Sequence, residues 1–319
     1  MSGSLTPSNG TRSVRDNAVL LGTLCSGLSA LGYSAANVFL RRLVDTDPVL
    51  VATIKTIPTI LMTLPWLWLR YRAGQEETID RRSLWILLAV AVFGHLAGNV
   101  GFQLSLGVVG LVVAVPIVFG AMLISSPILS RWLLAEKVSQ RTMLAMTVLI
   151  IAIMILALNA KQISNGSDLT PASSASLLGA ILLLCLAGIA YTLLGIGISY
   201  GLKQGMSLPA CLFIVSSSGF VVLMAVAMLS VGWAGMLATE SQPWLDMLLA
   251  GIFNAVAFLA LTRALQLTTV THVNLINASQ VTLAAVTGVW LFNETPTVAL
   301  AVGIVITVIG LVMIQAPEE

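Results

Sequence analysis

The short stretches WLLAEK, at residues 132–137, and WLFNET, at residues 290–295, carry Trp, Leu and Glu at the same relative positions. Trp132 and Trp290 are 158 residues apart, about half of the 319-residue chain. Weaker matches with nearly the same offset follow the same order, including Pro48 and Pro209. A repeat with a constant offset is typical of a duplicated structural unit.

The composition is that of a membrane protein. Hydrophobic residues make up 58% of the chain and charged residues 9%, and the mean hydropathy is +1.00. Too few polar side chains remain to cover a water-soluble globule. The net charge of +2 provides no basic face, so no nucleic-acid partner is expected. The three cysteines lack the close pairing of a zinc or redox motif and are interpreted as packing residues.

Apolar runs of about 20 residues, the length that crosses a bilayer as a helix, occur ten times. The fold class predicted is therefore an all-α integral membrane protein with ten transmembrane helices. The predicted spans are 18–40, 48–69, 83–106, 110–134, 141–159, 176–200, 208–230, 244–266, 269–292 and 296–315.

The two quoted stretches end the fourth and the ninth span, so the repeating unit has five helices. A second copy of an odd-numbered unit enters the membrane from the other side, which predicts inverted repeats. Glu136 is then expected on the cytoplasmic side and Glu294 on the outer side. The predicted segments are a cytoplasmic tail (1–17), a first repeat (18–160), an extracytoplasmic linker (161–175), a second repeat (176–316) and a C-terminal tail (317–319).

Lys and Arg in the connecting segments indicate the orientation. If the N-terminus is cytoplasmic, most of these residues lie inside, and the outer segments hold Arg41, Arg42 and Lys161. Both termini are therefore predicted in the cytoplasm. The expected location is a bacterial inner (plasma) membrane, with membrane lipids as partners and either a monomer or a homodimer as the assembly.

On these residues the chain resembles the drug/metabolite transporter superfamily, in its EamA-type ten-helix branch. The resemblance extends from about residue 18 to 315 and rests on the doubled Glu-containing helix ends, on Pro48 and Pro209, and on Lys55, seven residues after Pro48. It implies a central cavity formed mainly by spans one, three, four, six, eight and nine. One departure is Asn274, which stands where a counterpart of Pro116 would be expected.

The third span carries a polar stripe. His95, Asn99 and Gln103 are four residues apart and are predicted to share one helical face. Because a polar side chain in hydrocarbon costs free energy unless it meets a partner or water, this face should point into the bundle. Lining of a solute pathway is favoured over hydrogen bonding between helices, which is the alternative.

Five further residues are candidates for solute contact. Asn277 and Gln280 lie three residues apart near the middle of the ninth span. Asn254 in the eighth span serves either the cavity or helix packing. Tyr33 and Tyr191 occupy related positions in spans one and six, where each can offer a hydroxyl and a ring to a solute or belong to the interfacial aromatic belt.

Lys55 is the ninth candidate and the one Lys or Arg well inside a predicted span. Its stem could carry the ammonium to the outer interface, or its charge could attract an anionic group such as a carboxylate. No Asp or Glu lies at mid-depth in any span, which disfavours a carboxylate-driven cation antiporter. If protons are coupled at all, His95 is the candidate, although a role in shaping the cavity is favoured.

Enzyme functions are not expected. The sequence has no Gly-rich phosphate loop, no cluster of His and Cys with metal-ligand spacing, and no extramembrane segment of more than about 17 residues. No catalytic residue, cofactor or metal is predicted. The predicted function is a secondary transporter or exporter that moves small polar metabolites, preferably amino-acid-like solutes, by alternating access. The alternatives are a broad-specificity exporter of lipophilic compounds and a non-transporting membrane partner or lipid-handling protein.

Overall fold

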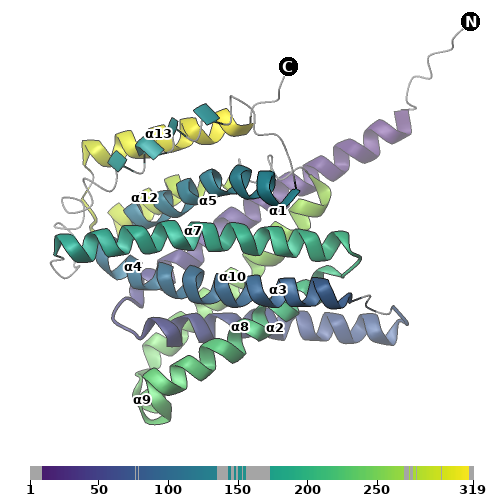
Figure 1. Ribbon diagram of the computed structural model, residues 1–319, viewed down its shortest axis with the longest axis horizontal. Helices are drawn as coiled ribbons and strands as arrows, with labels where there is room; N and C mark the ends of the chain where they lie inside the picture. The colour runs from purple at the N-terminus through teal and green to yellow at the C-terminus, as the bar shows by residue number, and fades with distance from the viewer. Residues whose placement is uncertain are drawn as a thin grey trace, which may run out of the picture.

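The structure, a computed structural model, is helical, and no strand occurs among the residues that it describes (Figure 1). The described residues are 9–75, 77, 79–134, 143–144, 147–148, 150–152, 154–155, 173–268, 273, 276–277, 279–295 and 297–315. The helices are α1 (Asn9–Arg42), α2 (Pro48–Arg72), α3 (Arg81–Phe93), the π-helix η1 (Gly94–Val100), α4 (Gly101–Val109), α5 (Leu111–Leu134), α7 (Ser174–Lys203), α8 (Leu208–Ser230), α9 (Gly232–Ala238), α10 (Ser241–Leu267), α12 (Ser279–Phe292) and α13 (Val298–Gln315).

Seven described helical segments are long and apolar enough to cross a membrane, which confirms a multi-pass helical protein. They are Val19–Arg42, Pro48–Arg72, Arg81–Val109, Leu111–Leu129, Ala175–Lys203, Leu208–Ser230 and Ser241–Leu267. Two shorter apolar helices, Ser279–Phe292 and Val298–Ile309, lie where the ninth and tenth spans are predicted. Most of the predicted fifth span, 141–159, lies outside the described residues, as do Glu136 and the linker 161–172.

Helices α2 and α8 begin in the same way. The Asp47 carboxylate accepts hydrogen bonds from two backbone N–H groups of the first turn of α2, and Pro48 is the first helical residue. The Ser207 hydroxyl caps α8, and Pro209 is its second residue. Proline is tolerated in a first turn because its missing N–H has no intrahelical partner there. Pro48 and Pro209, which match in the repeat, therefore both lie at helix starts.

The third span is not a uniform α-helix. Helices α3 and α4 are joined by η1, whose π-helical turns are wider than α-helical ones. After α4 the chain turns at Gly110, whose φ of +76° is a conformation that glycine adopts without steric cost. Helix α5 begins at the next residue. The short link predicts a tight pair of spans three and four, but these spans contact each other mainly where α4 meets α5, because α7 packs between α3 and α5.

The long helices pack in a small number of pairs. Helix α1 packs along α10, α2 packs along α8, and α7 lies between α3 and α5 (Figure 1). Helix α12 contacts both α1 and α5. Small residues allow close approach, as where Gly32 of α1 meets Ala257 and the carbonyl of Phe253 on α10. Small residues at contacts are the usual means of packing helices within a membrane.

One end of the bundle is filled by apolar side chains. Leu43, Leu50, Leu106, Val109 and Leu111 are almost completely buried there, where α1 ends, α2 begins and α4 turns into α5. Interiors of this kind are packed at the density of organic crystals and leave little free space. This end of the bundle is therefore closed.

Candidate functional site

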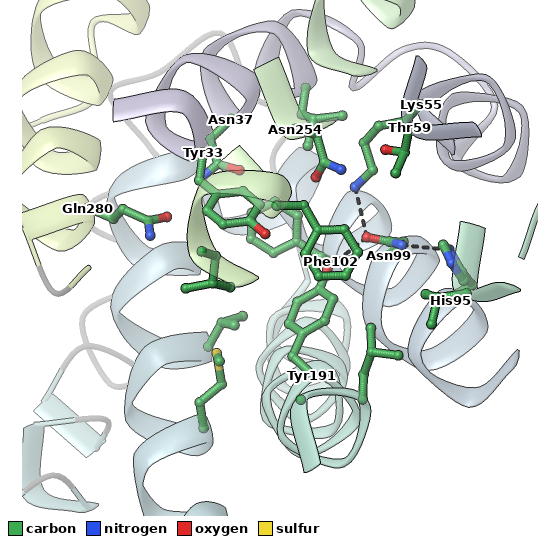
Figure 2. A pocket seen from close by; sticks show the side chains of 18 of the residues that line it. Tyr33, Asn37, Lys55, Thr59, His95, Asn99, Phe102, Tyr191, Asn254 and Gln280 are labelled. Atoms are coloured by element: carbon green, nitrogen blue, oxygen red, sulfur yellow. Dashed lines mark hydrogen bonds between the residues drawn. The ribbon is translucent and has the colours of Figure 1, made fainter. Parts of the chain in front are cut away.

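A cavity of about 230 Å³ lies inside the bundle (Figure 2). Its wall contains eight of the nine predicted site residues, which are Tyr33, Lys55, His95, Asn99, Tyr191, Asn254, Asn277 and Gln280. Other polar residues of the wall are Asn37, Thr56, Thr59 and Ser216, and its aromatic residues include Phe102, Phe119 and Phe258. The wall thus combines amide and hydroxyl groups with aromatic rings.

Asn99 is the centre of a hydrogen-bond network in the wall. Its Oδ1 accepts from Lys55 Nζ at 2.8 Å and from the Tyr191 hydroxyl at 3.0 Å, and its Nδ2 lies 2.8 Å from His95 Nδ1 (Figure 2). An ammonium can only donate, so this contact requires the Asn99 oxygen to face Lys55 and its NH₂ group to face His95. The NH₂ group then donates, and His95 Nδ1 accepts. The arrangement is that of a neutral imidazole with its proton on Nε2.

The network depends on glycines of neighbouring turns. A Cβ at Gly98 would lie 2.8 Å from Tyr191 Cε1, so only glycine leaves the tyrosine ring space to reach Asn99. A Cβ at Gly219 of α8 would overlap the His95 ring. Short π-helical segments occur often at functional sites, and η1 supplies both His95 and Asn99.

Lys55 places its ammonium in the cavity. The residue is 5% exposed, and Figure 2 shows its side chain directed to Asn99. Among the described residues of the wall it is the one Lys or Arg, and none is Asp or Glu. Ser216 holds the related position in the second repeat, seven residues after Pro209. In the described part of the chain, no group of three or more His, Cys, Asp or Glu could hold a metal ion.

A second polar group joins α1 to the α12 side of the cavity. Asn277 Oδ1 accepts from Ser29 Oγ at 3.2 Å and from Gln280 Nε2 at 2.9 Å. Asn277 Nδ2 donates to the carbonyl of Val273. These bonds hold Asn277 in place, whereas the amide oxygen of Gln280 makes no hydrogen bond within the described residues. Tyr33 and Gln280 both line the cavity (Figure 2).

Gln103 lies away from the cavity wall. Its Nε2 donates to the carbonyls of Leu40 and Leu43 at 3.0 and 3.2 Å, at the end of α1. The last carbonyls of a helix have no intrahelical partners, so Gln103 supplies donors that this buried helix end needs. Two polar residues of the ninth span, His272 and Asn274, lie outside the described residues.

Sequence reasoning missed three polar wall residues that it had the means to find. Asn37 lies four residues after Tyr33, and Thr59 lies four residues after Lys55, so each shares a helical face with a candidate. Ser216 repeats the spacing of Lys55 from a helix-starting proline. Helical periodicity and the internal repeat were the signals.

Glu294, from the second quoted stretch, joins Arg41 and the start of α5 at the closed end of the bundle. Its Oε1 accepts from Arg41 Nε at 3.1 Å and from Leu111 N at 2.9 Å, and its Oε2 accepts from Val112 N at 2.9 Å. The Arg41 and Glu294 side chains are 6% and 1% exposed. The Arg41 guanidinium also lies over the Phe292 ring, 5.2 Å from its centroid. The carboxylate thus neutralises Arg41 and satisfies two unpaired N–H groups at the start of α5.

The chain around Glu294 is shaped to bring the carboxylate inward. Asn293 has a φ of +51°, the left-handed conformation that asparagine tolerates after a helix. A Cβ at Gly110 would lie 2.6 Å from Glu294 Oε1, and a Cβ at Gly288 would lie 2.7 Å from Oε2. The sequence predicts only a side of the membrane for Glu294, and its burial against Arg41 was not predicted.

A second ion pair lies between helices at the far end of α2. Glu77 accepts from Arg70 Nε and from Ser207 N, each at 3.0 Å, and from the Ser207 hydroxyl. Partial burial acts to raise the pKa of Glu77, but the hydrogen bonds from Ser207 and Arg70 outweigh it and hold this pKa below its ordinary value. Glu77 thereby ties the α2–α3 connection to the start of α8.

The fold and the cavity define a class, a multi-pass helical membrane protein with a small polar chamber between its helices. Residues 20–158 and 178–316 each match the EamA-like transporter family, and the chain belongs to this family of membrane transporters in the drug/metabolite transporter superfamily. A solved structure described as "Crystal structure of protein" has a similar fold, with a TM-score of 0.62 and 14% identity over 92% of this chain and 94% of that chain. None of the curated proteins matches. The two matched segments confirm the internal repeat.

Proposed function

We propose that this chain is a secondary transporter that moves small polar metabolites, with amino-acid-like solutes preferred to sugars and nucleosides. The observation that carries the proposal is the cavity of about 230 Å³ with amide and hydroxyl groups from both repeats. Pockets for drug-sized ligands measure about 300–1,000 Å³, so a smaller solute fits better. Aromatic rings beside the polar groups suit a solute that has a short apolar part as well.

Ten helices in two inverted five-helix repeats are part of the proposal. The helix contacts support this arrangement, because a contact of a helix of the first repeat with a helix of the second has a counterpart in which the two repeats change places. Span one packs on span eight as span six packs on span three, and span nine packs on span one as span four packs on span six. Two such repeats can rock around a fixed central site, which is the basis of alternating access. We retain the predicted cytoplasmic termini, the bacterial inner membrane, and a monomer or homodimer.

The ion pair at the closed end supports alternating access. Arg41 belongs to the first matched segment and Glu294 to the second, so their contact joins the two repeats. Opening this end requires Glu294 to separate from Arg41 and from the backbone N–H groups of Leu111 and Val112 at the start of α5. In the predicted topology both residues lie on the outer side, and the structure then corresponds to a state closed to the outside.

Uptake into liposomes tests the proposal. The purified protein is reconstituted and supplied with labelled L-amino acids, a hexose, a nucleoside and a lipophilic cation. We expect saturable uptake and counterflow of amino acids. Preference for the lipophilic cation would replace the proposal with a broad-specificity exporter, and absence of saturable uptake across the panel would favour a non-transporting membrane partner or a lipid-handling protein.

A further inference from the structure

We infer that Lys55 binds a carboxylate of the solute and selects small carboxylic acids, amino acids included, over the corresponding amides and amines. The inference rests on the proposed transport function and deepens it, because it names the chemical group that the cavity recognises.

Lys55 has no counter-ion among the described residues. The ion pairs found there join Arg41 to Glu294 and Arg70 to Glu77, and neither involves Lys55. A buried cation without an anion costs free energy, which proteins normally offset by pairing. Since the described wall of the cavity contains no carboxylate, a solute that enters with one supplies the missing charge.

The ammonium has donors to spare. It carries three N–H groups, and Asn99 Oδ1 is its hydrogen-bond acceptor in the described part of the chain. The remaining N–H groups match a carboxylate, which offers two oxygens and four lone-pair sites. Thr59, one turn after Lys55 on α2, and Asn254 of α10 line the same cavity and are drawn on the same side of it as the ammonium in Figure 2. Their side chains make no hydrogen bond with the described residues, so they are available to donate to a carboxylate.

The ammonium is held in place before any solute arrives. Tyr191 and His95 orient the Asn99 amide, and that amide orients Lys55. A group positioned in advance loses less entropy on binding, which increases affinity and selectivity. A lysine without a binding role would instead extend its side chain toward the membrane interface, where water hydrates the ammonium.

The position of the Lys55 charge also determines how the solute is oriented in the cavity. Ser216, the repeat counterpart of Lys55, is neutral, so the described wall is cationic at one place only. The carboxylate is directed to Lys55, and the rest of the solute extends toward Tyr33, Asn37 and Gln280 (Figure 2). Their hydroxyl and amide oxygens can accept hydrogen bonds from an amino group.

The test compares alanine, serine, leucine and phenylalanine with their carboxamides and with the decarboxylated amines. Binding is measured as thermal stabilisation of the purified protein over a concentration series, and transport as counterflow in liposomes. We expect each bound acid to half-saturate at a concentration roughly 10- to 100-fold lower than its amide, the range that a charge-assisted hydrogen bond gives. The amines should behave like the amides.

Three variants assign the preference. Lys55→Met should remove it, and Lys55→Arg should retain part of it because the positive charge remains. Lys203→Met is the matched control, since Lys203 is an exposed lysine at the end of α7, and it should behave as the unmodified protein does.

The outcomes separate the two proposals. Equal binding of acids and amides by the unmodified protein would overturn the assignment of Lys55 while leaving transport established, and this result does not depend on the folding of any variant. An acid preference that survives in folded Lys55→Met would overturn it as well. If no compound binds or is transported, the proposed function fails and the inference fails with it.

Discussion

Glu294→Gln is expected to open the end of the cavity that the Arg41–Glu294 pair closes. The substitution preserves the size of the side chain and removes its negative charge. Arg41 then stays buried without its partner, and the amide oxygen of glutamine accepts only part of what the two carboxylate oxygens accept from Leu111 and Val112. The cost falls on the closed state, because water solvates both side chains once this end opens.

The magnitude follows from the burial of the pair. With side chains 6% and 1% exposed, loss of one partner should cost about 3–5 kcal/mol, as for other buried ion pairs. Each ~1.4 kcal/mol is a factor of ten in an equilibrium constant. The ratio of closed to open molecules should therefore fall by roughly a hundredfold or more.

A thiol reporter measures this shift. Leu40→Cys, in a protein whose three native cysteines are replaced, puts a thiol in the cavity wall next to Arg41. An impermeant maleimide added to intact cells should label it slowly, and Glu294→Gln should accelerate labelling by a similar factor. Glu77→Gln is the control, because it makes the same chemical change in a carboxylate paired with Arg70 at the other end of α2.

Labelling of folded Glu294→Gln protein at the unmodified rate would refute a role of the Arg41–Glu294 pair in closing this end. Arg41 and Glu294 would then stabilise the protein equally in both states, and their separation would not limit opening. Labelling that increases equally in the Glu77→Gln control would also contradict it, because general loosening would explain the result.

Asn99→Leu should reduce uptake and also lower stability by about 1–3 kcal/mol, because the buried ammonium of Lys55 loses its acceptor; thermal melting and counterflow measure the two effects. His95→Gln should retain both counterflow and accumulation driven by a pH gradient, because His95 Nδ1 serves as an acceptor for Asn99 and the amide oxygen of glutamine can accept in its place. Loss of the pH-driven accumulation alone would show proton coupling through His95. Glu77→Gln should melt at a lower temperature at neutral pH, and the deficit should shrink as the pH falls below 4.5, the ordinary pKa of Glu77, because the hydrogen bonds from Ser207 stabilise the charged form. A deficit that is independent of pH would show that the charge of Glu77 does not contribute.

Local sequence signals predicted most of the described helices and eight residues of the cavity wall. Apolar runs located the seven described helical segments that can cross a membrane, Pro48 and Pro209 marked two helix starts, and the repeated stretch pointed to duplication before any contact was known. The first two signals are local, because they depend on the length of a run or on the missing N–H of proline, and the third needs only a comparison of the two halves of the sequence.

What the sequence did not predict depends on tertiary contacts. A regular α-helix puts His95, Asn99 and Gln103 on one face, but η1 ends between Asn99 and Gln103, and Gln103 binds the end of α1 instead. The partner of Glu294 is Arg41, 253 residues earlier, and no local pattern links them. Charged and polar residues at depth identified the region of the cavity, whereas their partners required the folded chain.

The charge of Lys55, which has no counter-ion among the described residues, has an electrical consequence for the proposed cycle. As the helices move around a fixed site, the ammonium is in contact with water first on one side of the membrane and then on the other, so the potential that it experiences changes. One elementary charge moved through 100 mV corresponds to about 2.3 kcal/mol. When the cytoplasm is electrically negative relative to the outside, the membrane potential therefore favours the empty carrier in its cytoplasm-facing state. A simple carboxylate cancels this bias during the loaded step, whereas a zwitterion leaves it in force in both directions.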